Sequence, residues 1–139
     1  MTVPLIEQAR KALEAAHVPY SAYPVGAALE TDSGDVFVGC NIENANYSNS
    51  LHAEEVALAE AVKTGQTTFS RLAVSSAPRD GVTPCGMCRQ TLAEFASDDL
   101  EIMCDTGDSV NRYRLGELLP ETISEETLRE AGQRAEADE

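Results

Sequence analysis

The stretch Pro84-Cys85-Gly86-Met87-Cys88 constrains this chain more than any other part of its sequence. Two cysteines three positions apart point the same way when the segment opens a helix, so both thiolates can reach one metal ion. A helix N-terminus favours negative charge, which lowers the pKa of a thiol and helps it to bind a cation. Pro84 suits the residue before such a helix. The sequence therefore predicts a helix that begins at these cysteines and supplies two metal ligands.

A third ligand is expected from an upstream segment, Ser50-Leu51-His52-Ala53-Glu54-Glu55. His52 can complete a three-ligand zinc site with Cys85 and Cys88, and Glu54 can serve as a general acid and base. The combination of His-x-Glu with a later Pro-Cys-x-x-Cys is typical of zinc deaminases. Cys-x-x-Cys alone would be a weak signal, because it also occurs in redox and structural zinc sites. We predict one zinc ion per chain.

Three protein ligands are typical of catalytic zinc sites, at which water becomes a nucleophile near neutral pH. Glu54 is expected to move protons between that water, a ring nitrogen and a departing amino group, which requires hydrogen-bond reach to each. A structural zinc site is the alternative interpretation, but it would need a fourth protein ligand. Cys40 and Cys104 lie at predicted strand ends and are expected to be small buried residues instead.

The charge balance argues against a nucleic-acid partner. The net charge is −14, with 24 acidic residues against 10 basic ones. Polynucleotide binding normally uses clustered lysine and arginine, and none is visible, so a monomeric substrate is favoured. An acidic surface with only two lysines, Lys11 and Lys63, is also typical of a protein from a halophile. Salt at roughly 1 M in the cytoplasm screens charge repulsion beyond about 3 Å. An ordinary acidic protein from a mesophile is the alternative.

The 139 residues suffice for one domain with its own core, and we predict a single domain over 1–139. No apolar run approaches the length of a membrane span, and the N-terminus lacks the basic and apolar regions of a signal peptide. We expect a cytoplasmic protein with reduced cysteines and no membrane partner.

Apolar periodicity and turn residues predict alternating strands and helices. Helices are expected over 3–17 and 51–64, from the cysteine motif onward and after Ser124, with a frayed acidic tail over about 133–139. Strands are expected over 25–29, 36–40, 72–74, 100–104 and 110–115. The asparagine-rich segment 41–50 is expected to be a surface loop. Because two helices start at strand ends and meet over one metal, we predict an α/β protein, a three-layer α/β/α sandwich around a mixed sheet of about five strands.

At this point the chain resembles the small, single-domain cytidine deaminases. The resembling segments cover nearly the whole chain in order and are 23–29, 40–45, 52–54, 84–90 and 117–120. The resemblance implies a cytidine deaminase-like fold and a homotetramer whose active sites are completed across subunits. It also implies a role in pyrimidine salvage, the zinc-dependent hydrolysis of cytidine or deoxycytidine to the uridine form plus ammonia.

The resemblance also implies roles for individual residues. It assigns zinc binding to His52, Cys85 and Cys88, and proton transfer to Glu54. The implied substrate-binding residues are Asn41 and Glu43 at the ribose, Ala53 through its backbone at the base, Tyr23 where the family usually has phenylalanine against the base, and Ala45 and Tyr47 reaching a neighbour's ligand. An ordinary loop carboxylate for Glu43 and a core aromatic for Tyr23 are the alternative interpretations.

Three positions depart from the family pattern. Small members often carry cysteine where His52 stands and arginine where Glu55 stands. Zinc with two thiolates and a neutral imidazole is about neutral, so an arginine that offsets negative charge is less needed. Glu55 is then expected to have no chemical role, and Arg89 remains available to donate a hydrogen bond to a thiolate. Ile123 lies where the family often places an aromatic that stacks on a neighbour's base.

Two other functions stay open. The chain could deaminate a different amino-bearing nucleoside, such as a nucleoside antibiotic, although Asn41-x-Glu43 favours a plain nucleoside. It could also be a non-catalytic zinc-binding or nucleic-acid-associated module, against which Glu54 and the acidic charge both argue.

Overall fold

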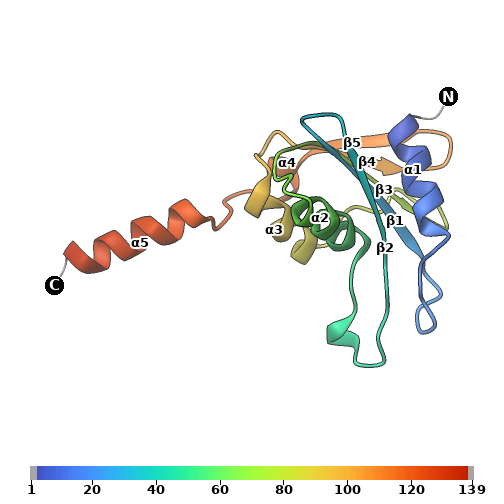
Figure 1. Ribbon diagram of the computed structural model, residues 1–139, viewed down its shortest axis with the longest axis horizontal. Helices are drawn as coiled ribbons and strands as arrows, with labels where there is room; N and C mark the ends of the chain where they lie inside the picture. The colour runs from blue at the N-terminus through green and yellow to red at the C-terminus, as the bar shows by residue number, and fades with distance from the viewer. Residues whose placement is uncertain (1–2, 138–139) are drawn as a thin grey trace.

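In the computed structural model, which describes residues 3–137, five strands form one mixed sheet in the order β2-β1-β3-β4-β5 (Figure 1). The strands are β1 (Val25–Thr31), β2 (Val36–Cys40), β3 (Phe69–Ser76), β4 (Glu101–Asp105) and β5 (Val110–Arg114). β3 and β4 run parallel, and the other neighbouring pairs are antiparallel. All five predicted strands are present, and β3 extends beyond its predicted ends.

Helices cover both faces of this sheet, as Figure 1 shows. α1 (Pro4–Leu13) lies on one face, while α2 (Ala53–Lys63), α3 (Gly86–Phe95) and the short α4 (Leu115–Leu118) lie on the other. A 3-10 turn, η1 (Tyr47–Asn49), interrupts the long loop after β2. The predicted three-layer α/β/α sandwich is therefore confirmed. No helix within residues 3–137 combines the length and apolarity needed to cross a bilayer.

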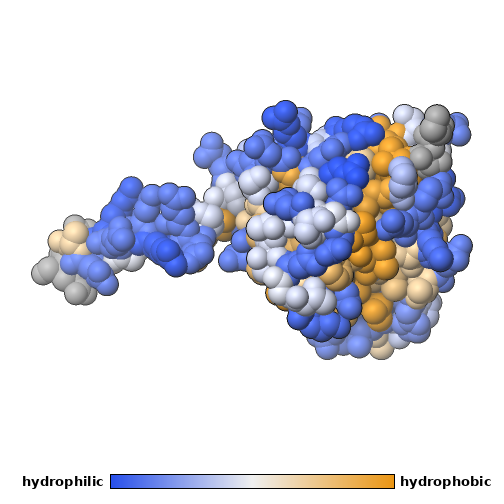
Figure 2. All heavy atoms as spheres, turned by 45° about the horizontal axis from the view of Figure 1, so that its top comes forward, coloured by the Kyte–Doolittle hydropathy of each residue, from blue (hydrophilic) through white to orange (hydrophobic). Residues whose placement is uncertain are grey.

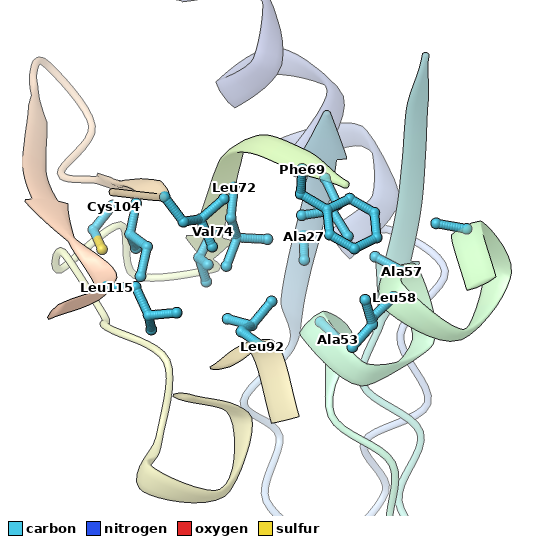
Figure 3. Close-up of a cluster of buried hydrophobic side chains, with 14 residues drawn as sticks. Ala27, Ala53, Ala57, Leu58, Phe69, Leu72, Val74, Leu92, Cys104 and Leu115 are labelled. Carbon is cyan, nitrogen blue, oxygen red and sulfur yellow. The ribbon is translucent and has the colours of Figure 1, made fainter. Parts of the chain in front are cut away.

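The central strands supply two separate cores because successive side chains point to opposite faces. Leu72 and Ile102 pair in register on the face covered by α2 and α3, where they join the cluster drawn in Figure 3. Ala28, Ala73 and Met103 align across three strands on the other face and pack beneath α1. The small side chains of Ala28 and Ala73 leave room for α1 on this second face.

Gly39 of β2 determines how closely α2 can approach the sheet. A Cβ atom at this position would lie 2.4 Å from the carbonyl oxygen of Ala53 and 2.6 Å from the backbone nitrogen of Ala57. Both atoms belong to the backbone of α2, so they cannot rotate away as a side chain would. Glycine therefore allows the first turn of α2, which follows His52, to lie directly on β2.

Replacing Gly39 with alanine should lower the free energy of unfolding by about 1–3 kcal/mol or more, because α2 must move off the sheet. Gly132→Ala is the matched control, since no atom lies within 4 Å of its added Cβ. This control lies in a helix, where alanine is favoured over glycine by up to about 1 kcal/mol. Urea unfolding measures both variants, and equal stabilities for the two would contradict this account of Gly39.

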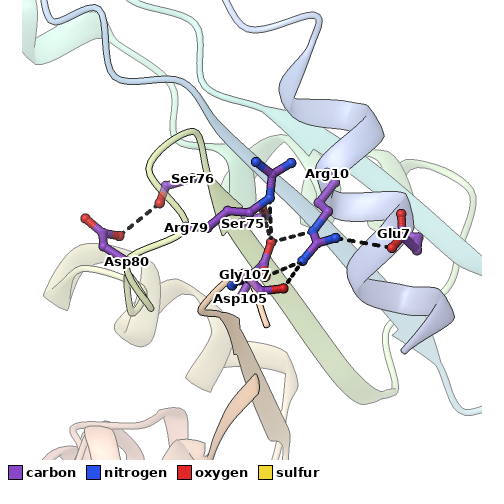
Figure 4. Close-up of polar contacts among 8 residues, drawn as sticks. All are labelled: Glu7, Arg10, Ser75, Ser76, Arg79, Asp80, Asp105 and Gly107. Carbon is purple, nitrogen blue, oxygen red and sulfur yellow. Dashed lines mark hydrogen bonds and ion pairs between the residues drawn. The ribbon is translucent and has the colours of Figure 1, made fainter. Parts of the chain in front are cut away.

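Asp105, at the end of β4, is the centre of a polar network on the α1 side of the molecule (Figure 4). Its side chain is fully buried. It accepts hydrogen bonds from Arg10 Nε at 2.7 Å, Arg10 Nη2 at 2.8 Å, Ser75 Oγ at 2.7 Å and the Gly107 backbone N–H at 2.9 Å. Arg79 Nε lies 3.4 Å from the same carboxylate. These donors outweigh the effect of burial and hold the pKa of Asp105 at about 2.

A folded-state pKa below the ordinary value means that Asp105 stabilises the fold fully above about pH 4 and loses this contribution as the pH falls toward 2. Asp105→Asn should therefore lower the free energy of unfolding by about 2–3 kcal/mol at pH 7. The difference from the wild type should shrink between pH 4 and pH 2. Urea unfolding across this range measures it, and a difference that does not change with pH would rule out the ionised carboxylate as its source.

α5 (Glu125–Ala137) extends away from the rest of the structure (Figure 1). Figure 2 shows polar side chains over this helix and a band of apolar surface across the rest of the molecule. None of its described residues is buried. Ser124 caps it as predicted, accepting the Thr127 backbone N–H at 3.2 Å. In the tail expected to fray, about 133–139, the residues as far as Ala137 are helical, and 138–139 lie outside the described residues.

Candidate active site

The three predicted metal ligands stand at the starts of two helices. His52 is the N-cap residue of α2, and Cys85 is the N-cap residue of α3. Cys88 occupies the third position of α3, so its side chain lies on the same side of the helix start as that of Cys85. The structure thus brings together, from two segments more than 30 residues apart, the group that the spacing predicted.

The ligand atoms of this group lie close enough to share one ion. His52 Nδ1 is 3.2 Å from Cys85 Sγ and 3.2 Å from Cys88 Sγ, and all three atoms lie within 4.8 Å of one another. Tetrahedral zinc, with its usual bond lengths, separates nitrogen and sulfur ligands by about 3.5 Å. Nitrogen with two thiolates is also a donor set that zinc prefers. The residues therefore fit zinc, and this is the one such cluster in the described part of the chain.

The two cysteines differ in their surroundings. Cys85 is exposed at the opening of the site, whereas Cys88 is buried beneath it. Burial raises the pKa of the Cys88 thiol, and the nearby Glu54 and Cys85 raise it further. A coordinated metal reverses this effect, because a thiol gives up its proton when it binds the cation.

Glu54 is a buried carboxylate, only 6% exposed, in the first turn of α2. Burial raises its pKa, and the nearby His52 partly offsets this shift. The side chain helps to line a cavity of about 190 Å³ beside the metal ligands. A cavity of this size can hold one small ring. The other lining residues are Val25, Asn41, His52, Ala53, Val74, Val82, Thr83 and Cys85.

A second, more open cavity of about 410 Å³ adjoins the first and shares Asn41 and His52 with it. Asn41 is held in place from both ends of its amide. Its Oδ1 accepts the Val25 backbone N–H at 2.8 Å, and its Nδ2 donates to the Tyr23 carbonyl oxygen at 3.0 Å. Asn41 therefore stands rigidly where the two cavities meet.

Glu43 lines the second cavity and is oriented by the backbone of the loop before β1. Its Oε1 accepts the N–H groups of Tyr20 at 3.0 Å and Ser21 at 3.1 Å. Hydrogen bonding to Ser21 is the main cause that lowers the pKa of Glu43, so this carboxylate is ionised near neutral pH. Glu43 is thus a loop carboxylate whose orientation is set by two backbone N–H groups.

Of the remaining predicted substrate contacts, Tyr47 lines the larger cavity, whereas Tyr23 and Ala45 line neither. Tyr23 is not among the residues that line either cavity, and its hydroxyl donates to Asp80 Oδ2 at 2.8 Å. Ala45 and Tyr47 lie on the exposed loop after β2, where the Tyr47 side chain is 74% exposed. The Tyr47 ring packs edge-on against Tyr20 with 5.7 Å between ring centroids.

Arg89 contacts oxygen atoms and not a thiolate, in contrast to the prediction. Its Nε donates to the Pro84 carbonyl oxygen at 2.7 Å, Nη1 to the Leu118 carbonyl oxygen at 2.8 Å and Nη2 to Thr83 Oγ1 at 3.0 Å. The planar fork of the guanidinium is occupied by these three acceptors. Arg89 therefore fastens the segment that leads into Cys85 to the end of α4.

Val82 and Thr83 line the small cavity from the loop before α3. They were not predicted, because no local sequence pattern marks a loop residue that turns inward. Glu55 was expected to be either a solvated carboxylate or one that supports a ligand without chemistry of its own. Its Oε1 accepts the backbone N–H of His52 at 2.7 Å. A glutamate three positions after a helix cap is a recognised sequence signal for this contact.

The fold and the site together define a zinc-binding deaminase-like protein, and comparisons with known proteins identify its family. Residues 3–104 match the model of the cytidine and deoxycytidylate deaminase zinc-binding region. A cytidine deaminase of Sporosarcina psychrophila is 41% identical over 125 residues, which cover 89% of this chain and 92% of that protein. A cytidine deaminase of Mycobacterium tuberculosis is 38% identical over 120 residues, covering 86% and 87% respectively.

Solved structures agree with these sequence relatives. The crystal structure of cytidine deaminase from Burkholderia pseudomallei superposes with a TM-score of 0.83 at 40% identity, covering 88% of this chain and 100% of that one. The chain belongs to the cytidine and deoxycytidylate deaminase family. The predicted family, fold class and zinc-dependent hydrolytic enzyme are thereby confirmed.

Proposed function

We propose that this chain hydrolyses cytidine and deoxycytidine to the corresponding uridine nucleosides and ammonia, with Glu54 as the proton carrier. Zinc would be held by His52, Cys85 and Cys88. One observation carries the assignment of these residues: the buried Glu54 and the candidate ligands His52 and Cys85 line the same ring-sized cavity.

The chemistry follows from what the side chains can do. When bound, zinc supplies Lewis acidity that lowers the pKa of water to about 7. Glu54 accepts a proton from the attacking water and delivers it to ring nitrogen N3, which makes C4 electrophilic. The water oxygen forms a bond to C4, Glu54 passes the second proton to the amino group, and the C4–N bond breaks to release ammonia.

The two adjoining cavities suggest how the nucleoside lies. The base would enter the small cavity beside Glu54, where the backbone of Ala53 can contact it. The ribose would then face Asn41 and Glu43 at the border of the larger cavity. An ionised, oriented Glu43 can accept hydrogen bonds from sugar hydroxyls. The acidic chain disfavours a polynucleotide in this position.

We propose that the active enzyme is a homotetramer. Large apolar side chains are exposed on α3, on the loop between β2 and α2 and on the segment before α5, which is typical of surfaces that contact another chain. They include Ile42, Tyr47, Leu51, Met87, Phe95 and Ile123, with exposures between 37% and 74%. Ala45 and Tyr47, on the loop after β2, would then reach a neighbouring subunit's ligand.

Four free cysteines suit a reducing compartment, which supports a cytoplasmic location.

Glu54→Gln should retain zinc and the folded structure but lose activity by about 10²–10⁴-fold, because the amide cannot accept and return a proton. Cytidine turnover, bound zinc and far-ultraviolet circular dichroism measure the three properties on the same preparation. A variant that turns over cytidine near the wild-type rate would exclude Glu54 as the proton carrier.

The proposed activity is tested by the loss of cytidine and deoxycytidine absorbance on addition of purified protein, with bound zinc quantified in parallel. We expect conversion with about one zinc per chain. The assay is repeated in dilute buffer and at about 1 M salt, where screening relieves repulsion across the acidic surface. Zinc without conversion of either nucleoside would reject this substrate assignment, and full activity in dilute buffer would count against a halophilic origin.

A further inference from the structure

Hydrogen bonds hold the backbone around His52 at successive positions. The preceding residue, Leu51, exchanges two backbone hydrogen bonds with Ile42, at 2.8 and 2.9 Å. The carbonyl oxygen of His52 accepts the Val56 N–H at 3.0 Å, the first bond of α2. The N–H group of His52 donates to Glu55 Oε1 at 2.7 Å. Glu55 therefore supplies, through a side chain, the contact that the helix itself cannot provide.

The position of this contact matters because His52 lies only half inside the helix. Its backbone is extended, with φ −90° and ψ 151°, so helical hydrogen bonding does not determine where its N–H points. The imidazole must nevertheless place Nδ1 between two sulfur atoms, 3.2 Å from each. A rotation of the backbone at His52 would carry the ring away from Cys85 and Cys88.

The two neighbouring glutamates of α2 divide their tasks according to helix geometry. Successive residues are turned by about 100° around the axis, so Glu54 and Glu55 face different directions. Glu54 is buried beside the small cavity. The Glu55 side chain is half-buried and turns back toward the helix start, as a side chain at this position commonly does.

We infer that Glu55 is a positioning residue that fixes the backbone of His52 and so presents the imidazole to zinc together with Cys85 and Cys88. The inference rests on the zinc site of the proposed function. Glu55 acts as a hydrogen-bond acceptor, and its negative charge is not required for this role. Partners that orient metal ligands typically change metal affinity by about 10–100-fold when they are lost.

Two substitutions of similar length separate hydrogen bonding from charge. Glu55→Gln removes the charge but keeps an oxygen that can accept the His52 N–H, whereas Glu55→Met fills the same space without a strong acceptor. The matched control is Glu60→Gln on the exposed side of α2, where Glu60 pairs with Lys63 at 3.2 Å. Each protein is loaded with zinc, and the transfer of zinc to a coloured chelator is followed without substrate. Circular dichroism recorded during the transfer shows whether the fold persists.

Glu55→Met should release zinc about 10–100-fold faster than the wild type while it remains folded. Glu55→Gln and Glu60→Gln should release zinc within about twofold of the wild-type rate. Release from Glu55→Met at the wild-type rate would overturn the inference. Equally fast release from Glu55→Gln and Glu55→Met would also overturn it, because charge would then be the cause.

The same experiment separates this inference from the proposed function. A wild-type protein that holds zinc but converts no cytidine would reject the substrate assignment, and the release rates would still decide the role of Glu55. A wild-type protein that binds no zinc would reject both.

Discussion

The rest of this structure depends on one constraint, which is that the N-termini of α2 and α3 lie next to each other. His52 caps α2 and Cys85 caps α3, so each candidate ligand lies in the turn least restrained by helical hydrogen bonds. A slide of either helix would separate the imidazole nitrogen from the sulfur atoms. The close contact at Gly39, where α2 lies on β2 with no room for a Cβ atom, prevents such a slide.

The opposite side of the sheet supports the cavity wall from behind. Asp105 connects α1 to β3 and β4, and its carbonyl oxygen accepts the Gly81 N–H at 3.0 Å in the loop before α3. Arg89 holds the next part of this loop through the Thr83 hydroxyl. A loop that faces a cavity has few apolar contacts of its own, so these polar anchors define its path. Asp105 thus restrains this loop through its backbone, while its carboxylate connects α1 to β3.

Side chains at the site act through their neighbours as much as through their own chemistry. Asn41 is held by two backbone groups before any substrate arrives, and Glu43 is oriented by the loop at Tyr20. Glu55 does the same for the backbone of His52. Groups that are already in position lose little conformational freedom when a substrate binds. More of the binding free energy is then left to stabilise the reacting atoms in the transition state.

Local spacing explains why the structure brings together the candidate residues that the sequence singled out. Cys85 and Cys88 share a side because a helix places residues three apart together, and His52 and Glu54 follow from a pattern typical of one chemistry. The strands were found because their apolar residues stand out between turns, although β3 proved longer than predicted. The acceptors of Arg89 are not the predicted thiolate but a side-chain oxygen and two carbonyl oxygens, which only the folded chain brings near.

The sequence by itself determined the α/β class, the acidic character and the choice of candidate metal ligands and proton carrier, because each depends on residue type and short spacing. The tertiary structure decided the sheet order, the two cavities, the anchoring of Arg89 and Asp105, and the direction of the Tyr23 hydroxyl toward Asp80. These features depend on contacts between residues distant in the chain. No local pattern encodes such contacts, because their free energy arises only when the core brings the segments together.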